Sequence, residues 1–276
     1  MAIEKASNPA AFLDFERAGW KRSIAAYDEG FGVVSRQTVS ATLDAARVEP
    51  GMRILDVCCG PGMLSAGAIS RGADAVGLDF PDVVALARKL VPTASFEVSD
   101  AQALPFADNS FDAVVCGYGV MHLPDPEKAL CDMLRVVRPD RRVAITVWDS
   151  RVPNNGFSLV YGAIRAHGKV DVPLPHGADF FQFGTPDKMR AALKEIGFTN
   201  VDATAFDQKW HVQSAADVFN AIANGTVRAR ALLEAQSESA MAGIRQWFEQ
   251  TVGAMGSAEK GYQVPVPAII GSGAKP

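Results

Sequence analysis

Residues 53–62 constrain the fold of this chain more than any other stretch, because they join an apolar strand to a glycine turn. The turn leads into helical sequence, and two further apolar strands end at Asp79 and Asp100. In open α/β sheets the carboxyl ends of parallel strands form one crevice, where ligands bind. Glycines in such a turn let a ligand approach the backbone closely. The pattern therefore predicts an α/β fold with an acid-lined crevice that holds a nucleoside.

Strands and helices alternate through the middle of the chain, which predicts a parallel sheet covered by helices on both faces. The expected strands are residues 53–57, 75–78, 95–98, 113–116 and 143–147, and the expected helices follow Gly62, follow Pro81 and span 126–137.

The flanking segments differ in character from this core. Residues 1–45 are expected to form a helical lid, 46–150 the core, and 151–276 the rest of the sheet with helical cover insertions, all within a single domain. In the last segment we expect a Pro/Gly-broken connection at 151–183, a helix at 186–196 stopped by Gly197, strand-like sequence at 201–212, two or three helices over 215–252 and a last strand at 262–271. A strand reached after a helical excursion predicts an antiparallel hairpin at the sheet edge.

Composition narrows the function classes. The 276 residues carry a net charge of −4 with no Lys/Arg run, which argues against a nucleic-acid partner. No apolar stretch reaches membrane-spanning length, and residues 1–9 lack a signal core, so we expect a cytoplasmic protein without membrane contact. The four cysteines, at positions 58, 59, 116 and 131, form no Cys-x-x-Cys pair and are expected to be buried free thiols, with no metal site.

The glycine turn distinguishes between ligand classes. Gly60 and Gly62 fit a turn close to a ligand, but Ser65 stands where a dinucleotide fingerprint would have its third glycine. Asp56, which ends the first strand, suits an ammonium group better than a phosphate. Asp79 can accept both ribose hydroxyls, or instead cap the helix at Pro81.

The third acid, Asp100, can accept the adenine amino group, while the backbone N–H of Ala101 donates to a ring nitrogen. The alternative is an acid that only caps its own loop. A nicotinamide-dependent oxidoreductase would also need a constellation such as Tyr-x-x-x-Lys, which the chain lacks.

These residues resemble the class I S-adenosylmethionine (SAM) methyltransferases, close to the ubiquinone/menaquinone-biosynthesis-like methyltransferase type 11 group. The resemblance spans residues 50–148 and rests on Ile54-Leu55-Asp56-Val57-Cys58-Cys59-Gly60-Pro61-Gly62, Val76-Gly77-Leu78-Asp79, Asp100-Ala101-Gln102-Ala103-Leu104-Pro105-Phe106, Ser110-Phe111-Asp112-Ala113-Val114-Val115, Met121-His122-Leu123-Pro124-Asp125 and Arg135-Val136-Val137-Arg138-Pro139.

The resemblance implies a Rossmann-like, seven-stranded, mostly parallel sheet with an antiparallel C-terminal hairpin and a helical lid over the strand C-terminal edge. It also implies SAM as cofactor. Asp56 and the Gly60 backbone would hold its methionine end, the Gly117 carbonyl its ammonium, Asp79 its ribose, and Asp100 with Ala101 its adenine. Further cofactor contacts are expected at Trp20, Tyr27, Cys58, Gly62 and Phe80. Cys58 and Asp140 depart from the family, which usually has Gly at both places.

Methyl transfer from a sulfonium has a neutral leaving group, so a base is needed only when the acceptor must lose a proton. His122 is the candidate base, with a structural role as the alternative; His176 and His211 are weaker candidates, and His167 is expected at the surface. No Asn/Asp-Pro-Pro-Tyr follows the fourth strand, which argues against amino methylation of nucleic-acid bases.

Seventeen of the 23 aromatic residues lie outside residues 46–150, which favours a small apolar or planar acceptor. Trp20 and Tyr27 would line its pocket or else pack in the core. The N-terminal helix could pack on its own domain or on a second copy, so a homo-oligomer stays possible. The leading interpretation is a SAM-dependent methyltransferase, and a SAM-binding protein without catalysis is the alternative.

Overall fold

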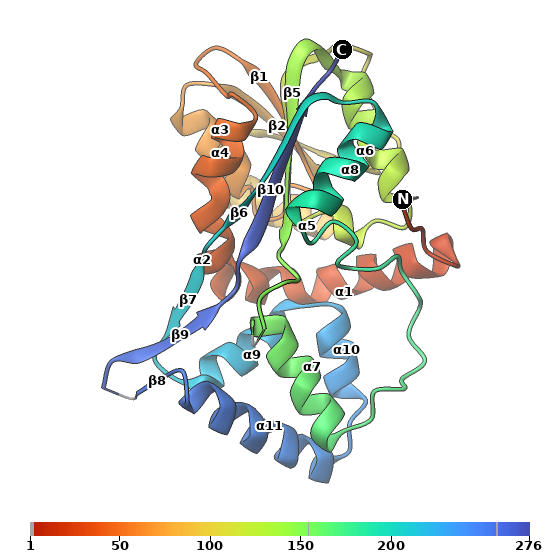
Figure 1. The fold of residues 1–276 in the computed structure, drawn as a ribbon. Helices are drawn as coiled ribbons and strands as arrows, with labels where there is room; N and C mark the ends of the chain where they lie inside the picture. The colour runs from red at the N-terminus through yellow and green to blue at the C-terminus, as the bar shows by residue number, and fades with distance from the viewer. Residues whose placement is uncertain (1–2, 154, 258) are drawn as a thin grey trace.

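A seven-stranded sheet forms the centre of the described residues, which are 3–153, 155–257 and 259–276 of the computed structural model (Figure 1). Met1 and Ala2, part of the start in which we expected no signal peptide, lie outside them. In spatial order the strands are β3 (Ser95–Val98), β2 (Asp74–Asp79), β1 (Arg53–Val57), β4 (Phe111–Gly117), β5 (Val137–Trp148), β10 (Ala268–Ala274) and β6 (Thr199–Phe206).

The expected mostly parallel sheet is confirmed. The first five strands in this order pair in parallel, for example Leu55 with Val76 and with Val114. Only β10 is antiparallel to both of its neighbours, with Ile269 opposite Val147 of β5 and Ala205 of β6. It lies between them rather than at the edge, because the chain returns from the helical excursion into the gap beside β5.

Alternate strand residues feed two cores on opposite faces of the sheet, as the pleat requires. Ile54 packs with α3 (Val39–Ala45) and α4 (Met63–Ser70), whereas Leu55 points to the larger core that includes α6 (Pro126–Val136) and α8 (Pro186–Ile196). The helix α5 (Pro81–Leu90) follows β2 and packs on Phe96 of β3.

A second group of elements lies beyond the C-terminal ends of the parallel strands (Figure 1). It comprises α1 (Pro9–Glu29), the short turns α2 (Gly32–Ser35), η1 (Arg36–Thr38) and η2 (Val120–His122), the helices α7 (Gly156–His167), α9 (Ala215–Gly225), α10 (Arg228–Glu234) and α11 (Glu238–Gly253), and a small sheet of β7 (Lys209–Val212), β9 (Gly261–Pro265) and β8 (Gly256–Ser257). Helix α1 packs on α9 and α5 and so spans the edge where the crevice was expected.

Two expectations outside the core were wrong. The connection 151–183 contains α7, a twelve-residue helix that Asn155 caps by accepting from Phe157 N and Ser158 N. We expected the glycines of this segment to interrupt regular structure. A Cβ on Gly162 would lie 3.0 Å from the Trp247 ring, so this glycine instead allows α7 to pack closely on α11. The last strand is two strands, β9 and β10, which are separated at Val266 and Pro267 and pair in different sheets. The strand-like sequence expected at 201–212 is confirmed; it forms β6 and β7, which belong to different sheets.

The helices Pro186–Ile196 and 126–136 lie where they were expected, and Gly197 ends the former at a φ of 109°. All four cysteines are free, but Cys131 is exposed, so the expectation that every thiol is buried was wrong for this residue. Within the described ranges, no helix combines the length and apolar character needed to cross a membrane.

Candidate functional site

The turn after β1 runs through three residues with positive φ: Cys58 at 56°, Gly60 at 55° and Gly62 at 88°. Nothing lies within 4 Å of a Cβ built on Gly60, so a side chain there would project into open space above the turn. A Cβ on Gly62 would instead lie 3.0 Å from Val91 Cγ2 and 3.1 Å from Phe96 Cζ. Gly60 therefore keeps a ligand space open, whereas Gly62 allows close packing.

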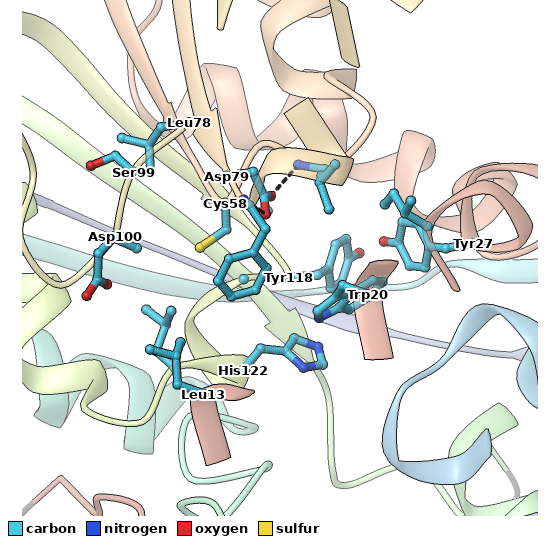
Figure 2. Close-up of a pocket in the computed structure, with 18 residues that line it drawn as sticks. Leu13, Trp20, Tyr27, Cys58, Leu78, Asp79, Ser99, Asp100, Tyr118 and His122 are labelled. Atoms are coloured by element: carbon cyan, nitrogen blue, oxygen red, sulfur yellow. Dashed lines mark hydrogen bonds between the residues drawn. The ribbon is translucent and has the colours of Figure 1, made fainter. Parts of the chain in front are cut away.

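The carboxylate of Asp79 ties the end of β2 to this turn. One oxygen accepts from the Gly60 backbone N at 2.9 Å and the other from Phe80 N at 2.7 Å (Figure 2). Helix α5 has no side-chain cap, so the alternative role of Asp79 as its N-cap was wrong. Burial raises the Asp79 pKa to about 6, and the two backbone hydrogen bonds oppose that rise.

Asp56 is held from one side only. Its Oδ2 accepts from the backbone N and the hydroxyl of Ser65, at 3.0 and 2.7 Å. Its Oδ1 is buried and has no hydrogen-bond partner among the described residues. Burial raises the Asp56 pKa to about 7 against the opposing bonds from Ser65. An unpartnered buried acceptor is costly, so this oxygen marks a place for a ligand donor.

Asp100 lies on the loop after β3 with its side chain exposed. Its Oδ1 accepts from the backbone N and the side-chain amide of Gln102, at 2.8 and 3.1 Å. The Gln102 carbonyl in turn accepts from Asp125 N. This chain of bonds orients the Asp100 carboxylate beside the buried backbone of Ala101.

A cleft joins these acids along the sheet edge. Figure 2 shows Ser99 and Asp100 at one end and Trp20 and Tyr27 at the other, with Cys58, Asp79 and Tyr118 between them. The cleft is lined by Leu13, Trp20, Ile24, Tyr27, Cys58, Gly60, Leu78, Asp79, Phe80, Val83, Ser99, Asp100, Ala101, Gly117, Tyr118, Gly119, His122 and Leu123. A deeper branch shares Cys58, Gly60 and Gly117 with it and reaches Asp56.

A second hollow, of about 270 Å³, lies next to the cleft and is called the aromatic cavity below. Its lining is Phe12, Glu16, Trp20, Tyr27, Phe31, Tyr118, Met121, His122, Trp148, Phe157, Tyr161, His176, Gly177, Ala178, Phe180, Gly225, Thr226, Val227, Arg228 and Ala229. Trp20, Tyr27, Tyr118 and His122 line both spaces and so form a shared wall.

Tyr118 makes this wall rigid. Its ring stacks on Trp148 with centroids 4.0 Å apart, and its hydroxyl accepts from Gln208 Nε2 at 2.9 Å and lies 3.2 Å from the Thr38 hydroxyl. The backbone at Tyr118 takes a φ of 57°, a conformation that non-glycine residues rarely adopt outside constrained sites.

His122 completes the wall. Its Nδ1 lies 3.0 Å from Oε2 of Glu16, a buried acid of α1. Trp20 and Phe180 meet its ring edge-on, at centroid distances of 5.1 and 5.4 Å.

The sequence and the fold are similar to those of known methyltransferases. A family model described as "Methyltransferase domain" matches residues 55–145. Demethylmenaquinone methyltransferase of Thermus thermophilus is 32% identical over 176 residues, covering 57% of this chain and 79% of that protein. The chain belongs to the class I SAM methyltransferase family. The enzyme of the same name from Renibacterium salmoninarum is 41% identical over 104 residues, covering 37% of this chain and 44% of that one. The chain thus spans about half the length of the first curated relatives that it matches.

Solved structures show the same methyltransferase fold. Phosphoethanolamine N-methyltransferase 2 of Haemonchus contortus, in complex with S-adenosyl-L-methionine, aligns with a TM-score of 0.58 at 18% identity over 96% of this chain and 60% of that one. The YcgJ protein of Bacillus subtilis aligns with a TM-score of 0.55 at 18% identity, over 87% of this chain and 98% of that one.

The structure brings together nearly all residues that the sequence singled out for this methyltransferase. The exception is Gly62, which lies outside the lining of both parts of the cleft, so its expected cofactor contact gains no support. Cys58 lines the cleft and also packs against the core, and a hydrogen bond with Cys116 together with burial raises its thiol pKa. Asp140 takes a φ of 60°, a left-handed backbone conformation that glycine adopts most readily.

Among the weaker histidine candidates, His176 lines the aromatic cavity, whereas His211 and His167 are exposed on β7 and α7. Sequence reasoning missed Glu16 as the partner of His122. A signal for it existed, because Glu16 lies on the helix face of Phe12, Gly19 and Ser23, where a lone charge is out of place.

Proposed function

We propose that this chain is a SAM-dependent methyltransferase whose acceptor is a small, planar and largely apolar molecule. The observation that carries the proposal is the unpartnered Oδ1 of Asp56, buried beside the glycine turn in the branch of the cleft that Gly60 and Gly117 also line. A dinucleotide would bring a pyrophosphate to this turn, and a buried carboxylate would repel it.

The residues fit the chemical groups of SAM one by one. Asp56 offers an acceptor to the ammonium, and the space above Gly60 admits the methionine chain. Asp79 and Asp100 offer carboxylates for the ribose and the adenine amino group, each already oriented by backbone bonds. When bound, SAM supplies a methyl group activated by its positive sulfur.

The residues of the protein exclude water from the site and align the two reactants. Helix α1 covers the cleft and excludes water through its side chains Leu13, Trp20, Ile24 and Tyr27. The stacking of Tyr118 on Trp148 fixes the wall between the cleft and the aromatic cavity. Alignment of two reactants in a dry site supplies most of the rate enhancement that a transfer with a neutral leaving group needs.

The acceptor class rests on the aromatic cavity. Tyr118, Met121 and His122 are its only lining residues within the family-model range 55–145; the others are Phe31 and residues of α1, α7 and the segments around 148, 176–180 and 225–229. The relatives are named for demethylmenaquinone, but most of the residues that line the cavity lie outside residues 55–145, which the family model matches. The cavity's own Phe and Trp rings favour a flat, apolar molecule.

Calorimetric titration with S-adenosylhomocysteine (SAH), with NADH as the control ligand, tests the proposal. Micromolar binding of SAH alone supports it. Binding of NADH in preference to SAH overturns it, and binding of SAH without methylation of any aromatic metabolite would favour a non-catalytic SAM-binding protein.

A further inference from the structure

The contact between Glu16 and His122 goes beyond cofactor binding, and the role inferred for it here rests on the proposed function. Glu16 is 3% exposed and comes from the lid helix, 106 residues before His122 in the chain. Its Oε2 faces Nδ1 of the imidazole at 3.0 Å. A carboxylate can only accept, so Nδ1 carries the proton and the neutral ring presents a lone pair at Nε2.

That second nitrogen is free within the described residues. No side chain or backbone group there bonds Nε2, and the ring is fixed by its edge-on contacts with Trp20 and Phe180. The ring lies in the wall shared by the cleft and the aromatic cavity, which is where an acceptor atom would meet the methyl group.

The other titratable groups in this wall are unsuited to take a proton. The Tyr27 hydroxyl bonds Ser35 and the Tyr118 hydroxyl bonds Gln208, and burial raises the pKa of both phenols. Deeper in the aromatic cavity, burial also raises the pKa of Tyr161. Arg228 donates to the Pro175 carbonyl and lies over the Phe15 ring.

We propose that Glu16 and His122 form a base dyad, and that the acceptor is therefore an aromatic molecule with a hydroxyl that loses its proton during transfer. His122 is the catalytic base and Glu16 its positioning residue. An amine that reacts through a free lone pair, or a thiolate already ionised in solution, would have no use for such a pair.

The proposed reaction moves one proton to His122 and one methyl group to the acceptor oxygen. The hydroxyl proton moves to Nε2 of His122 while an electron pair on the acceptor oxygen forms the bond to the methyl carbon. The electron pair of the broken carbon–sulfur bond stays on sulfur, which becomes a neutral thioether. The imidazolium, stabilised by the Glu16 carboxylate, then returns the proton to water.

A test that needs no turnover reads the tautomer directly. Long-range ¹H–¹⁵N NMR of the SAH complex, assigned with His122→Gln, should show His122 protonated at Nδ1 and bare at Nε2. Glu16→Gln, which keeps the shape but can also donate, should yield a mixture of tautomers, and Glu29→Gln at the exposed end of the same helix should change nothing. His122 protonated at Nε2 in the wild type would overturn the dyad.

A chromophoric phenol tests the acceptor class. 2-Naphthol, added to the SAH complex at about pH 8, where the free probe is mostly neutral, should show at least threefold more of the anion band with wild type than with His122→Gln. Glu16→Gln should resemble His122→Gln, and Glu29→Gln the wild type. A probe that does not bind, or that binds with equal ionisation in all four proteins, rejects the inference. Failure of the wild type to bind SAH at all would instead reject the proposed function.

Discussion

Ser65 holds the carboxylate of Asp56 through both its backbone N and its hydroxyl, at 3.0 and 2.7 Å, and leaves the other carboxylate oxygen without a partner. The serine stands where a dinucleotide-binding turn would have a glycine. Ser65, in the first turn of α4, thus orients an acid that would repel a pyrophosphate ligand.

This pair predicts how cofactor affinity depends on pH. The Asp56 pKa is raised to about 7, and an ammonium group favours the ionised form, so SAH affinity should be highest near pH 8. Below pH 7 it should fall about tenfold per pH unit, and more steeply below pH 6 if Asp79, with a pKa of about 6, also binds in its ionised form. Calorimetry between pH 5.5 and 8, in buffers of different ionisation enthalpy, should detect proton release on binding at pH 6.5.

5′-Methylthioadenosine is the matched control for that experiment, because it lacks the amino-acid end. Its affinity should not fall between pH 8 and 7. A flat profile for SAH over the same interval would show that Asp56 does not meet the ammonium.

Asp56→Asn should make the ligand-free protein more stable at alkaline pH. The folded-state pKa of about 7 lies above the ordinary value of 3.8, so burial of the charge costs stability above pH 7, and the cost disappears as pH falls towards 4. At pH 8 the variant should unfold with a free energy about 1–3 kcal/mol higher, less than the full pKa difference because the amide leaves a buried donor unpaired. Denaturant unfolding of the wild type and the variant at pH 8 and at pH 5 measures this difference in the free energy of unfolding.

Exposed Asp74, on β2, provides the comparison, and Asp74→Asn should change unfolding equally at both pH values. A gain for Asp56→Asn at pH 5 as large as at pH 8 would contradict the assigned cause, since the carboxyl is protonated there.

Asp79→Asn should weaken SAH binding by about 1.5–3 kcal/mol, the scale of hydrogen bonds to a charged group. The amide oxygen can keep one of the two backbone bonds, to Gly60 or Phe80, so the turn should persist. Calorimetry measures the loss, and Asp74→Asn, at the exposed beginning of the same strand, serves as the control. Unchanged affinity in a folded variant would remove Asp79 from the ribose site.

Ala178→Trp should impair binding in the aromatic cavity without impairing binding in the cleft. Ala178 lines the aromatic cavity but not the cleft, so an indole there should block 2-naphthol, with at least tenfold weaker binding, while SAH affinity stays within twofold. Fluorescence titration of 2-naphthol measures the first and calorimetry the second. Val170→Trp, an exposed position on the same connection, should alter neither. Loss of SAH binding in Ala178→Trp would show that the two spaces are not independent.

Local patterns were sufficient for the core of the fold. The strands from β1 to β4, the helices of the core and the acids at the strand ends are set by short apolar runs, turns and caps within a few residues. Positions 56, 79 and 100 were therefore predicted together, because parallel strands necessarily bring their carboxyl ends to one edge.

The elements outside the core, at residues 151–276, were less predictable from the sequence. Glycine in α7 indicated a break because glycine has low helix propensity, yet Gly162 is there to admit Trp247, a contact made with a helix 85 residues later. The two strands at the C-terminus were read as one because their separation depends on which sheet each half can pair with.

The sequence by itself determined the α/β core, the glycine turn and the acids that suit a nucleoside carrying an ammonium, since each depends on interactions over a few residues or on the parallel order of the strands. Only the tertiary structure decided that Glu16 meets His122, that Tyr118 stacks on Trp148, and that an aromatic cavity opens beside the cleft. These features join side chains from distant segments, and their geometry follows from how the lid helices pack across the sheet edge, which no local pattern encodes.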